Sequence, residues 1–212
     1  EPEAMKKHGF DDWAMWTGSE TGNKASEKRY YDAYINTPEG SKTYEGKFGP
    51  DVYTDHLIKF MRKHKEEPMC LYYPMALVHR NWVASPDEPK AKSRLERHRS
   101  MVSYADKMVG KLIKSLDDLE MRDRTIVIFT TDNGTTGGRV GFTATRNGTE
   151  VVGAKGELTE AGVCAPFIVN CPGMVPEGVQ TDALTDFSDM LSKAKAMQEK
   201  MISAGGDDYK LD

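Results

Sequence analysis

The segment Thr125–Gly134, TIVIFTTDNG, most constrains the fold of this chain, because apolar and mostly β-branched side chains lead directly into an Asp-Asn-Gly turn. Such a run predicts a buried strand. In a mostly parallel α/β sheet, the end of this strand would place Asp132 and Asn133 at the edge where such folds build their sites. A carboxylate and an amide carbonyl are hard oxygen ligands for a cation, and Gly134 allows a sharp turn. An ordinary Asn-Gly hairpin turn explains the same residues equally well.

Composition limits the class of protein. The 212 residues are 38% apolar and 29% charged, which fits one ordinary globular domain or the surviving part of a larger one. No apolar run approaches the roughly 20 residues that cross a bilayer, so we expect no membrane span. The formal net charge of −4 argues against nucleic acid as a partner. Three cysteines without a CxxC spacing indicate neither a zinc site nor a disulfide framework.

The order of the expected elements indicates the fold class. Residues 1–50 lack apolar periodicity and are expected to be mainly loop. Helical spacing predicts helices from Asp51 to about Lys65, from about Ser93 to Leu119, and at Phe187–Ile202. Short apolar runs predict strands at Met69–Tyr73, within Thr125–Gly134 and at Pro166–Asn170. This alternation predicts an α/β protein with a mostly parallel sheet flanked by helices.

Two further side chains could carry chemistry. His79 follows the predicted strand Met69–Tyr73 and would emerge at the same sheet edge as Asp132, although lone histidines in such places are often structural. Lys155 lies in Gly153-Ala-Lys-Gly156, where glycines allow close backbone approach to a ligand and the ammonium group suits an oxyanion. An exposed lysine on a surface loop is the alternative interpretation.

Several short motifs, in colinear order from about His8 to Met190, resemble the sulfatase family of the alkaline-phosphatase-like superfamily. Each motif alone is weak, whereas their order is a specific signal. The matching segments are His8-Gly-Phe-Asp11 with the family's GFD, Pro68–Pro74 with "PFFLYYP", Met101–Gly110 with "MVxYxDxxVG", Thr125–Gly134 with "TxVIFTSDNG", and Gly153–Val169 with "GxKGxxxEGGxRVPxIV".

This resemblance implies an incomplete alkaline-phosphatase-like fold, with a partial α/β domain at 1–190 and a C-terminal helix and tail at 191–212. It implies that Asp132 and Asn133 are two ligands of a divalent cation, usually Ca²⁺. His79 and Lys155 would be catalytic residues that bind the sulfate group of a sulfate ester, such as a sulfated sugar or an aryl sulfate. Cations and N–H donors there would stabilise the charge that develops in sulfate transfer. A periplasmic, secreted or lysosomal location is typical of the family.

The chain departs from the family at the nucleophile. The family's formylglycine is made from the Cys or Ser of a C/S-x-P/A-x-R motif, which is absent here. Cys164-Ala-Pro-Phe-Ile168 comes nearest, but Ile168 stands where arginine is required. The paired aspartates and "GKWHLG" stretch that precede GFD in the family are also absent. We therefore expect that an N-terminal segment or a parent chain supplies the nucleophile, and that this chain alone is inactive.

Two other functions remain open at this point. The first is a phospho- or phosphonate-hydrolase of the same superfamily, which would share the Asp-Asn end of the metal site but differ in nucleophile and metal count. The second is a catalytically inactive binding or structural remnant that keeps the sheet and has lost the chemistry.

Overall fold

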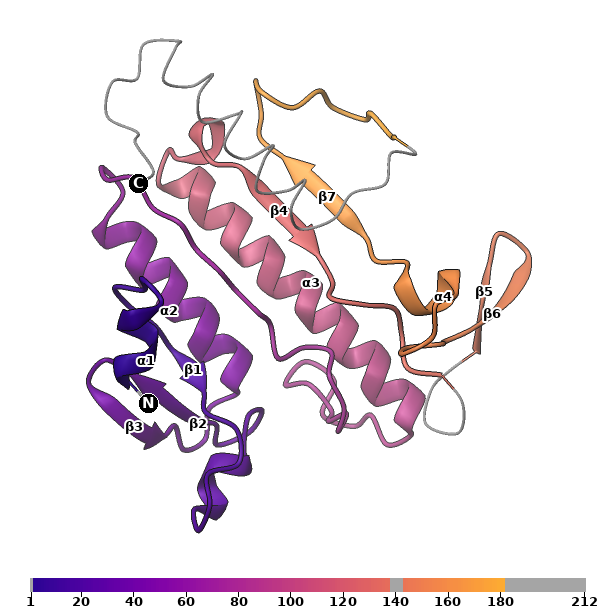
Figure 1. The fold of residues 1–212 in the computed structure, drawn as a ribbon, viewed down its shortest axis with the longest axis horizontal. Coiled ribbons are helices and arrows are strands. Elements are labelled where there is room, and N and C mark those ends of the chain that lie inside the picture. Colours follow the sequence, from indigo (N-terminus) through magenta and orange to yellow (C-terminus); the bar gives the residue numbers. More distant parts are fainter. Residues whose placement is uncertain (1, 138–142, 182–212) are drawn as a thin grey trace.

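The computed structural model describes residues 2–137 and 143–181 (Figure 1). The expected helix at 187–202 and the tail at 191–212 lie outside the described residues. The elements are α1 (Pro2–Lys7), β1 (Met15–Trp16), the 3-10 helix η1 (Lys24–Glu27), β2 (Tyr34–Thr37), β3 (Gly40–Thr43), α2 (Gly49–Lys63), α3 (Arg94–Asp118), the 3-10 helix η2 (Arg122–Arg124), β4 (Val127–Thr130), β5 (Thr143–Arg146), β6 (Thr149–Val152), α4 (Glu160–Val163) and β7 (Phe167–Asn170). None of these helices has both the length and the apolar character needed to cross a membrane.

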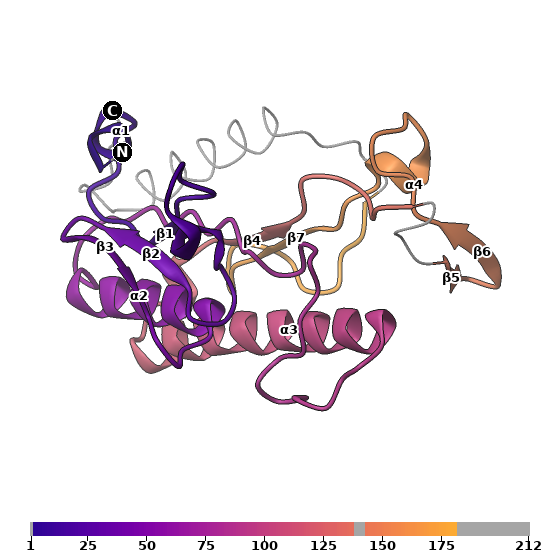
Figure 2. The same ribbon diagram turned by 90° about the horizontal axis from the view of Figure 1, so that it is seen from below.

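Helices α2 and α3 form one layer, and β4 and β7 lie on one side of it (Figure 2). Both helices were predicted from apolar periodicity. Pro50 in the first turn of α2 suits a helix start, because an N–H there has no partner within the helix. The two helices pack through the buried side chains of Met61 and Leu116, and Val127 of β4 packs against the same cluster. This contact fixes β4, and so the start of the turn that follows it, to the helix layer.

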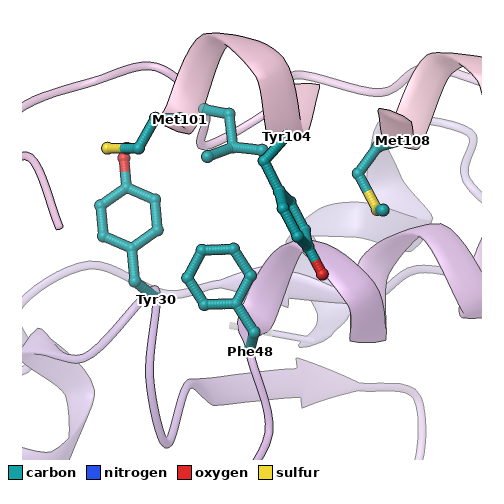
Figure 3. Packing of buried hydrophobic residues seen from close by; sticks show 6 residues of the cluster. Tyr30, Phe48, Met101, Tyr104 and Met108 are labelled. Carbon is teal, nitrogen blue, oxygen red and sulfur yellow. The ribbon is translucent and has the colours of Figure 1, made fainter. Parts of the chain in front are cut away.

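A buried apolar cluster joins the N-terminal region to α3 (Figure 3). Met101 is fully buried beside Tyr30, Phe48 and Tyr104. The rings of Phe48 and Tyr104 meet edge to face with centroids 5.1 Å apart, an arrangement that aromatic quadrupoles favour. The Tyr104 hydroxyl donates to both carboxylate oxygens of Asp51 at 2.9 Å. Burial, and then this carboxylate, raise the pKa of Tyr104, so the phenol remains a hydrogen-bond donor at neutral pH.

Residues 1–50 contain a small antiparallel sheet, β1-β2-β3, that the sequence analysis did not predict. Strands β2 and β3 form a hairpin in which Thr37 pairs with Gly40. Ile35 is fully buried, and the side-chain oxygen of Asn36 accepts a 2.8 Å hydrogen bond from the Trp13 indole. These strands are two to four residues long, too short to show an alternating apolar pattern. Packing and side-chain hydrogen bonds stabilise them instead.

The mostly parallel sheet is not confirmed, because all the strand pairs within residues 2–137 and 143–181 are antiparallel. Strand β4 pairs with β7, with Val127 opposite Asn170 and Thr130 opposite Phe167. A parallel pair needs a crossover that returns the chain along the sheet, usually through a helix. The helix described between β4 and β7 is α4, which has four residues. Strand β7 therefore begins at the same end of the sheet at which β4 ends.

The predicted strand at Met69–Tyr73 is extended but is not part of a strand ladder. Figure 1 shows that this segment runs in the same direction as β4 and opposite to α2 and α3. Met69 packs against the cluster that holds Val127, whereas Tyr72 is 68% exposed. Residues 69–73, α3 and β4 thus run in the directions expected for a β-α-β unit, but residues 69–73 do not pair with a strand as predicted.

Helix α3 begins with a capping box. The Ser93 hydroxyl accepts from the Glu96 N–H at 3.2 Å, and the Glu96 carboxylate accepts from the Ser93 N–H at 2.8 Å. Ser93→Ala is expected to lower the free energy of unfolding by about 1 kcal/mol, measured by urea denaturation. Ser103→Ala, at an exposed position of the same helix, is the matched control. An equal loss in both variants would contradict a capping role for Ser93.

The same box predicts a dependence on pH. Hydrogen bonds from the backbone N–H groups of Ser93 and Lys92 lower the pKa of Glu96. A carboxyl group whose pKa is lower in the folded state stabilises that state above its unfolded pKa, and this contribution is lost as the pH falls through the folded pKa. The destabilisation caused by Glu96→Gln, measured in urea at successive pH values, is therefore expected to be present at neutral pH and to shrink in acid.

Candidate active site

The turn after β4 is closely packed at Gly134. The Gly134 N–H donates to the carbonyl oxygen of Gly162 at 2.8 Å. A β-carbon added at Gly134 would lie 2.1 Å from the carbonyl oxygen of Ala161, so glycine is required for this approach. Asp132 is exposed and Asn133 is half-buried. The backbone of this turn therefore packs against the segment that contains α4, and it does not form the alternative Asn-Gly hairpin.

An Asn-Gly hairpin lies elsewhere in the chain, in a region for which the sequence predicted no strand. Asn147 and Gly148 join β5 to β6, and both have positive φ, at 51° and 80°. The pairing of Arg146 with Thr149 leaves a two-residue loop between the strands. An Asn-Gly pair with positive φ at both positions is typical of a two-residue hairpin turn. This dipeptide was the signal that could have predicted the hairpin.

Lys155 lies beside the turn that holds Asp132 and Asn133. Its backbone N–H donates to the carbonyl oxygen of Thr135 at 3.0 Å, two residues after Asn133. A β-carbon added at Gly153 would lie 2.6 Å from that same oxygen, so the two backbones are in close contact. Lys155 itself is exposed. The fold thus brings together the two segments that carry three of the four candidate site residues, through backbone contacts about twenty positions apart in the sequence.

His79 lies in the loop after the extended segment 69–73, and the buried Tyr30 anchors this loop. The Tyr30 hydroxyl lies 2.7 Å from the carbonyl oxygen of Ala76 and 2.6 Å from that of His79, and the His79 N–H donates to Ala76 at 3.0 Å. Burial raises the pKa of Tyr30 to about 12 against the opposing effect of Arg29, so its hydroxyl remains a donor near neutral pH. The backbone position of His79 is therefore well defined, although its side chain is exposed.

The four candidates are not all in contact. Where the structure is described, no hydrogen bond or ion pair joins His79 to Asp132, Asn133 or Lys155. The extended segment before His79 and strand β4 nevertheless run in the same direction in Figure 1, so both lead toward the same end of the layer. The common sheet edge expected for His79 and Asp132 remains a prediction.

Asp132 and Asn133 fit a calcium ion as part of a ligand set. Their side chains offer carboxylate and amide oxygens, the hard donors that this ion prefers. Calcium normally takes about 6–8 oxygens, so two side chains from one turn cannot complete its shell. The described residues contain no group of three or more His, Cys, Asp or Glu side chains placed to hold a metal. Further oxygen ligands are needed.

Arg29 contacts the His79 ring, although the sequence did not indicate it as a site residue. The Nη2 atom of Arg29 lies 2.9 Å from Nδ1 of His79 and also donates to the carbonyl oxygen of Arg80. The two residues are fifty positions apart. Arg29 lies in a polar stretch without periodicity, so nothing in the sequence indicated this pairing.

The Sulfatase family matches residues 2–195. The chain belongs to the sulfatase family. This confirms the resemblance drawn from the colinear motifs.

Two curated relatives and one crystal structure show how much of a sulfatase the chain covers. It is 30% identical over 158 residues to the N-acetylgalactosamine-6-O-sulfatase of Bacteroides thetaiotaomicron, covering 71% of this chain and 31% of that protein. It is 27% identical over 206 residues to the N-acetylgalactosamine-6-sulfatase of Homo sapiens, covering 90% of this chain and 38% of that protein. The crystal structure of Ps i-CgsB has the same fold, with a TM-score of 0.65 and 21% identity over 82% of this chain and 42% of that chain. The chain therefore spans about a third of the length of these curated relatives.

Proposed function

We propose that this chain forms part of a sulfuric ester hydrolase, in which Asp132 and Asn133 bind a divalent cation and His79 and Lys155 bind the sulfate group. The hydrogen bond from the Lys155 N–H to Thr135 is the single observation that carries the proposal. It joins the segment with the lysine to the turn with the cation ligands, two segments that belong together in a sulfate-binding site. Membership of the sulfatase family supports the same reaction class.

Each side chain has a role suited to its chemistry. The Lys155 ammonium group is a compact cation with three N–H donors, which suits the diffuse charge of an ester sulfate. The His79 imidazole can donate one N–H to a sulfate oxygen. Asp132 and Asn133 would hold calcium, which when bound supplies positive charge against the sulfate oxygens. All three kinds of group favour the state in which negative charge accumulates on the sulfate group.

A sulfated amino sugar is the substrate class that we propose. Two relatives are named as sulfatases acting on the 6-sulfate of N-acetylgalactosamine. The 212 residues contain no C/S-x-P/A-x-R motif from which the family's formylglycine could be made. We therefore expect this chain to bind its ligand without turning it over.

Calorimetric titration with CaCl₂ tests the cation site. The 212-residue chain is expected to bind Ca²⁺ weakly, with water in the remaining ligand positions, and Asp132→Asn is expected to weaken binding by at least the roughly 10–100-fold that even an outer-shell metal partner contributes. Asp106→Asn removes the same charge from an exposed position on α3 and is expected to have no effect. Equal losses in both variants would contradict the proposed ligands.

Titration with N-acetylgalactosamine 6-sulfate in the presence of Ca²⁺ tests the sulfate site. We expect binding of the sulfated sugar but not of unsulfated N-acetylgalactosamine. Equal affinity for both sugars would show that the sulfate group is not recognised. N-acetylgalactosamine 6-phosphate is the third ligand, and tighter binding of this ester would favour a phosphohydrolase of the same superfamily.

A further inference from the structure

Arg29 lies against the ring of His79 with a donor directed at one ring nitrogen. Its Nη2 atom is 2.9 Å from Nδ1 of His79, and the same nitrogen donates to the carbonyl oxygen of Arg80. Arg29 is half-buried and follows η1, whereas His79 is in the exposed loop after the segment 69–73. The contact joins the N-terminal region directly to a side chain of the proposed sulfate site.

Aromatic rings hold the Arg29 guanidinium in place. Its central carbon lies 5.1 Å from the ring centroid of Trp16 and 5.1 Å from that of Tyr30, within the range of cation–π attraction. The Trp16 indole N–H is fixed by a 2.6 Å hydrogen bond to the carbonyl oxygen of Ser26. Tyr30 also anchors the His79 loop through its hydroxyl. The guanidinium and the His79 loop therefore share one rigid support.

The backbone of Arg29 is fixed as well. The Gly49 N–H donates to the carbonyl oxygen of Tyr30 at 2.6 Å. A β-carbon added at Gly49 would lie 2.2 Å from the carbonyl oxygen of Arg29. The first turn of α2 thus packs directly against this backbone. An arginine whose backbone and guanidinium group are both held in place can determine which nitrogen of the contacted imidazole ring carries the proton.

Two hydrogen-bonding arrangements are open to Nδ1 of His79. Without a proton, Nδ1 accepts from Arg29, whose guanidinium has donors and no acceptor. With a proton, Nδ1 donates to the carbonyl oxygen of Arg80, which lies 2.5 Å away. The Arg80 oxygen is the nearer partner, but the hydrogen bond from Arg29 is charge-assisted, a class roughly twice as strong as hydrogen bonds between neutral groups. Nη2 also has two N–H groups, one for Nδ1 and one for the Arg80 oxygen. A proton on Nδ1 would also face the donor of Arg29.

We propose that Arg29 is a positioning residue that holds neutral His79 with its proton on Nε2. The Nε2–H group is then the hydrogen-bond donor that His79 presents to a sulfate oxygen, without the ring having to become cationic. The benefit for sulfate binding rests on the proposed function, whereas the choice of tautomer depends only on the contacts among Arg29, His79 and Arg80.

Long-range ¹H–¹⁵N correlation spectra of the imidazole rings test the tautomer directly. His79→Gln identifies the His79 signals. The wild-type chain is expected to give the Nε2–H pattern, and Arg29→Met is expected to lose it in favour of Nδ1–H donated to Arg80. Lys28→Met is the matched control, because it removes a neighbouring cation whose partner is Asp32 at 3.6 Å. This control is expected to leave the His79 signals unchanged.

The outcomes separate this inference from the proposed function. An Nδ1–H pattern in the wild-type chain would overturn the role of Arg29 without any variant, so the test does not depend on Arg29→Met folding. An Nε2–H pattern that persists in folded Arg29→Met would overturn it too. If the tautomer responds as expected but N-acetylgalactosamine 6-sulfate does not bind to the wild-type chain, the proposed function fails and the role of Arg29 stands. If the sugar binds, Arg29→Met is expected to weaken its affinity and Lys28→Met is not.

Discussion

Met101→Ala is expected to lower the free energy of unfolding by about 2–5 kcal/mol, as is typical when a buried methionine is truncated in a core. Met101 is fully buried on α3, in the cluster that also contains Tyr30 and Leu77. The substitution removes apolar contacts and leaves a cavity that the two rigid aromatic rings around it, Tyr30 and Tyr104, cannot easily fill. Urea denaturation followed by circular dichroism measures the loss.

Val102→Ala is the control for this substitution. Val102 is the next residue on α3 and is 46% exposed, so its truncation leaves no closed cavity. We expect the change in stability to be small beside that of Met101→Ala. Because Tyr30 anchors the His79 loop from the same cluster, Met101→Ala is also expected to broaden the His79 ring signals. Equal destabilisation by both variants would mean that this cluster does not control stability.

Lys155→Ala is expected to weaken binding of N-acetylgalactosamine 6-sulfate by roughly 10–150-fold. This range follows from a hydrogen bond to a charged group contributing about 1.5–3 kcal/mol, with each 1.4 kcal/mol equal to a factor of ten. The exposed ammonium group is not a packing element, so the fold should survive the change. Titration calorimetry of the variant in Ca²⁺ gives the ratio of affinities.

Two companion variants make this result specific. Lys63→Ala removes the same charge from an exposed position at the end of α2 and should leave the affinity unchanged. Lys155→Arg keeps the charge but replaces a compact ammonium with a planar fork, so an intermediate loss is expected. If Lys63→Ala and Lys155→Ala weaken binding equally, nonspecific attraction between lysine side chains and the sulfate would explain the effect, and Lys155 would not be a sulfate ligand.

Apolar periodicity predicted the long helices and the two central strands. The helix expected from about Ser93 to Leu119 is observed at Arg94–Asp118, and the strand predicted within Thr125–Gly134 is observed at Val127–Thr130. These elements are long or strongly apolar, so local chemistry decides them. The N-terminal sheet and the β5–β6 hairpin were missed, because their strands have two to four residues and depend on pairing and turn geometry.

Strand direction is the part of the predicted fold that is not confirmed. Counting alternating helices and strands favours parallel pairing, but β4 and β7 pair antiparallel. Thirty-six residues lie between them, enough for a crossover, but the described ones among them form turns, the β5–β6 hairpin and α4. Local composition does not determine whether a connection returns along the sheet or stays at one end, since that depends on packing against the rest of the fold.

The sequence by itself determined the family and predicted the four candidate site residues. Both follow from the order of short motifs and from the chemistry of carboxylate, amide, imidazole and ammonium groups, which a linear chain carries openly. Tertiary structure alone decided which segments of the chain lie together. The segment with Lys155 lies beside the turn that follows β4 because glycine allows the two backbones to approach closely. Arg29 contacts His79, fifty positions away in the sequence, because aromatic side chains pack around the guanidinium group. Contacts of this kind depend on the whole packed core, so no local pattern in the sequence records them.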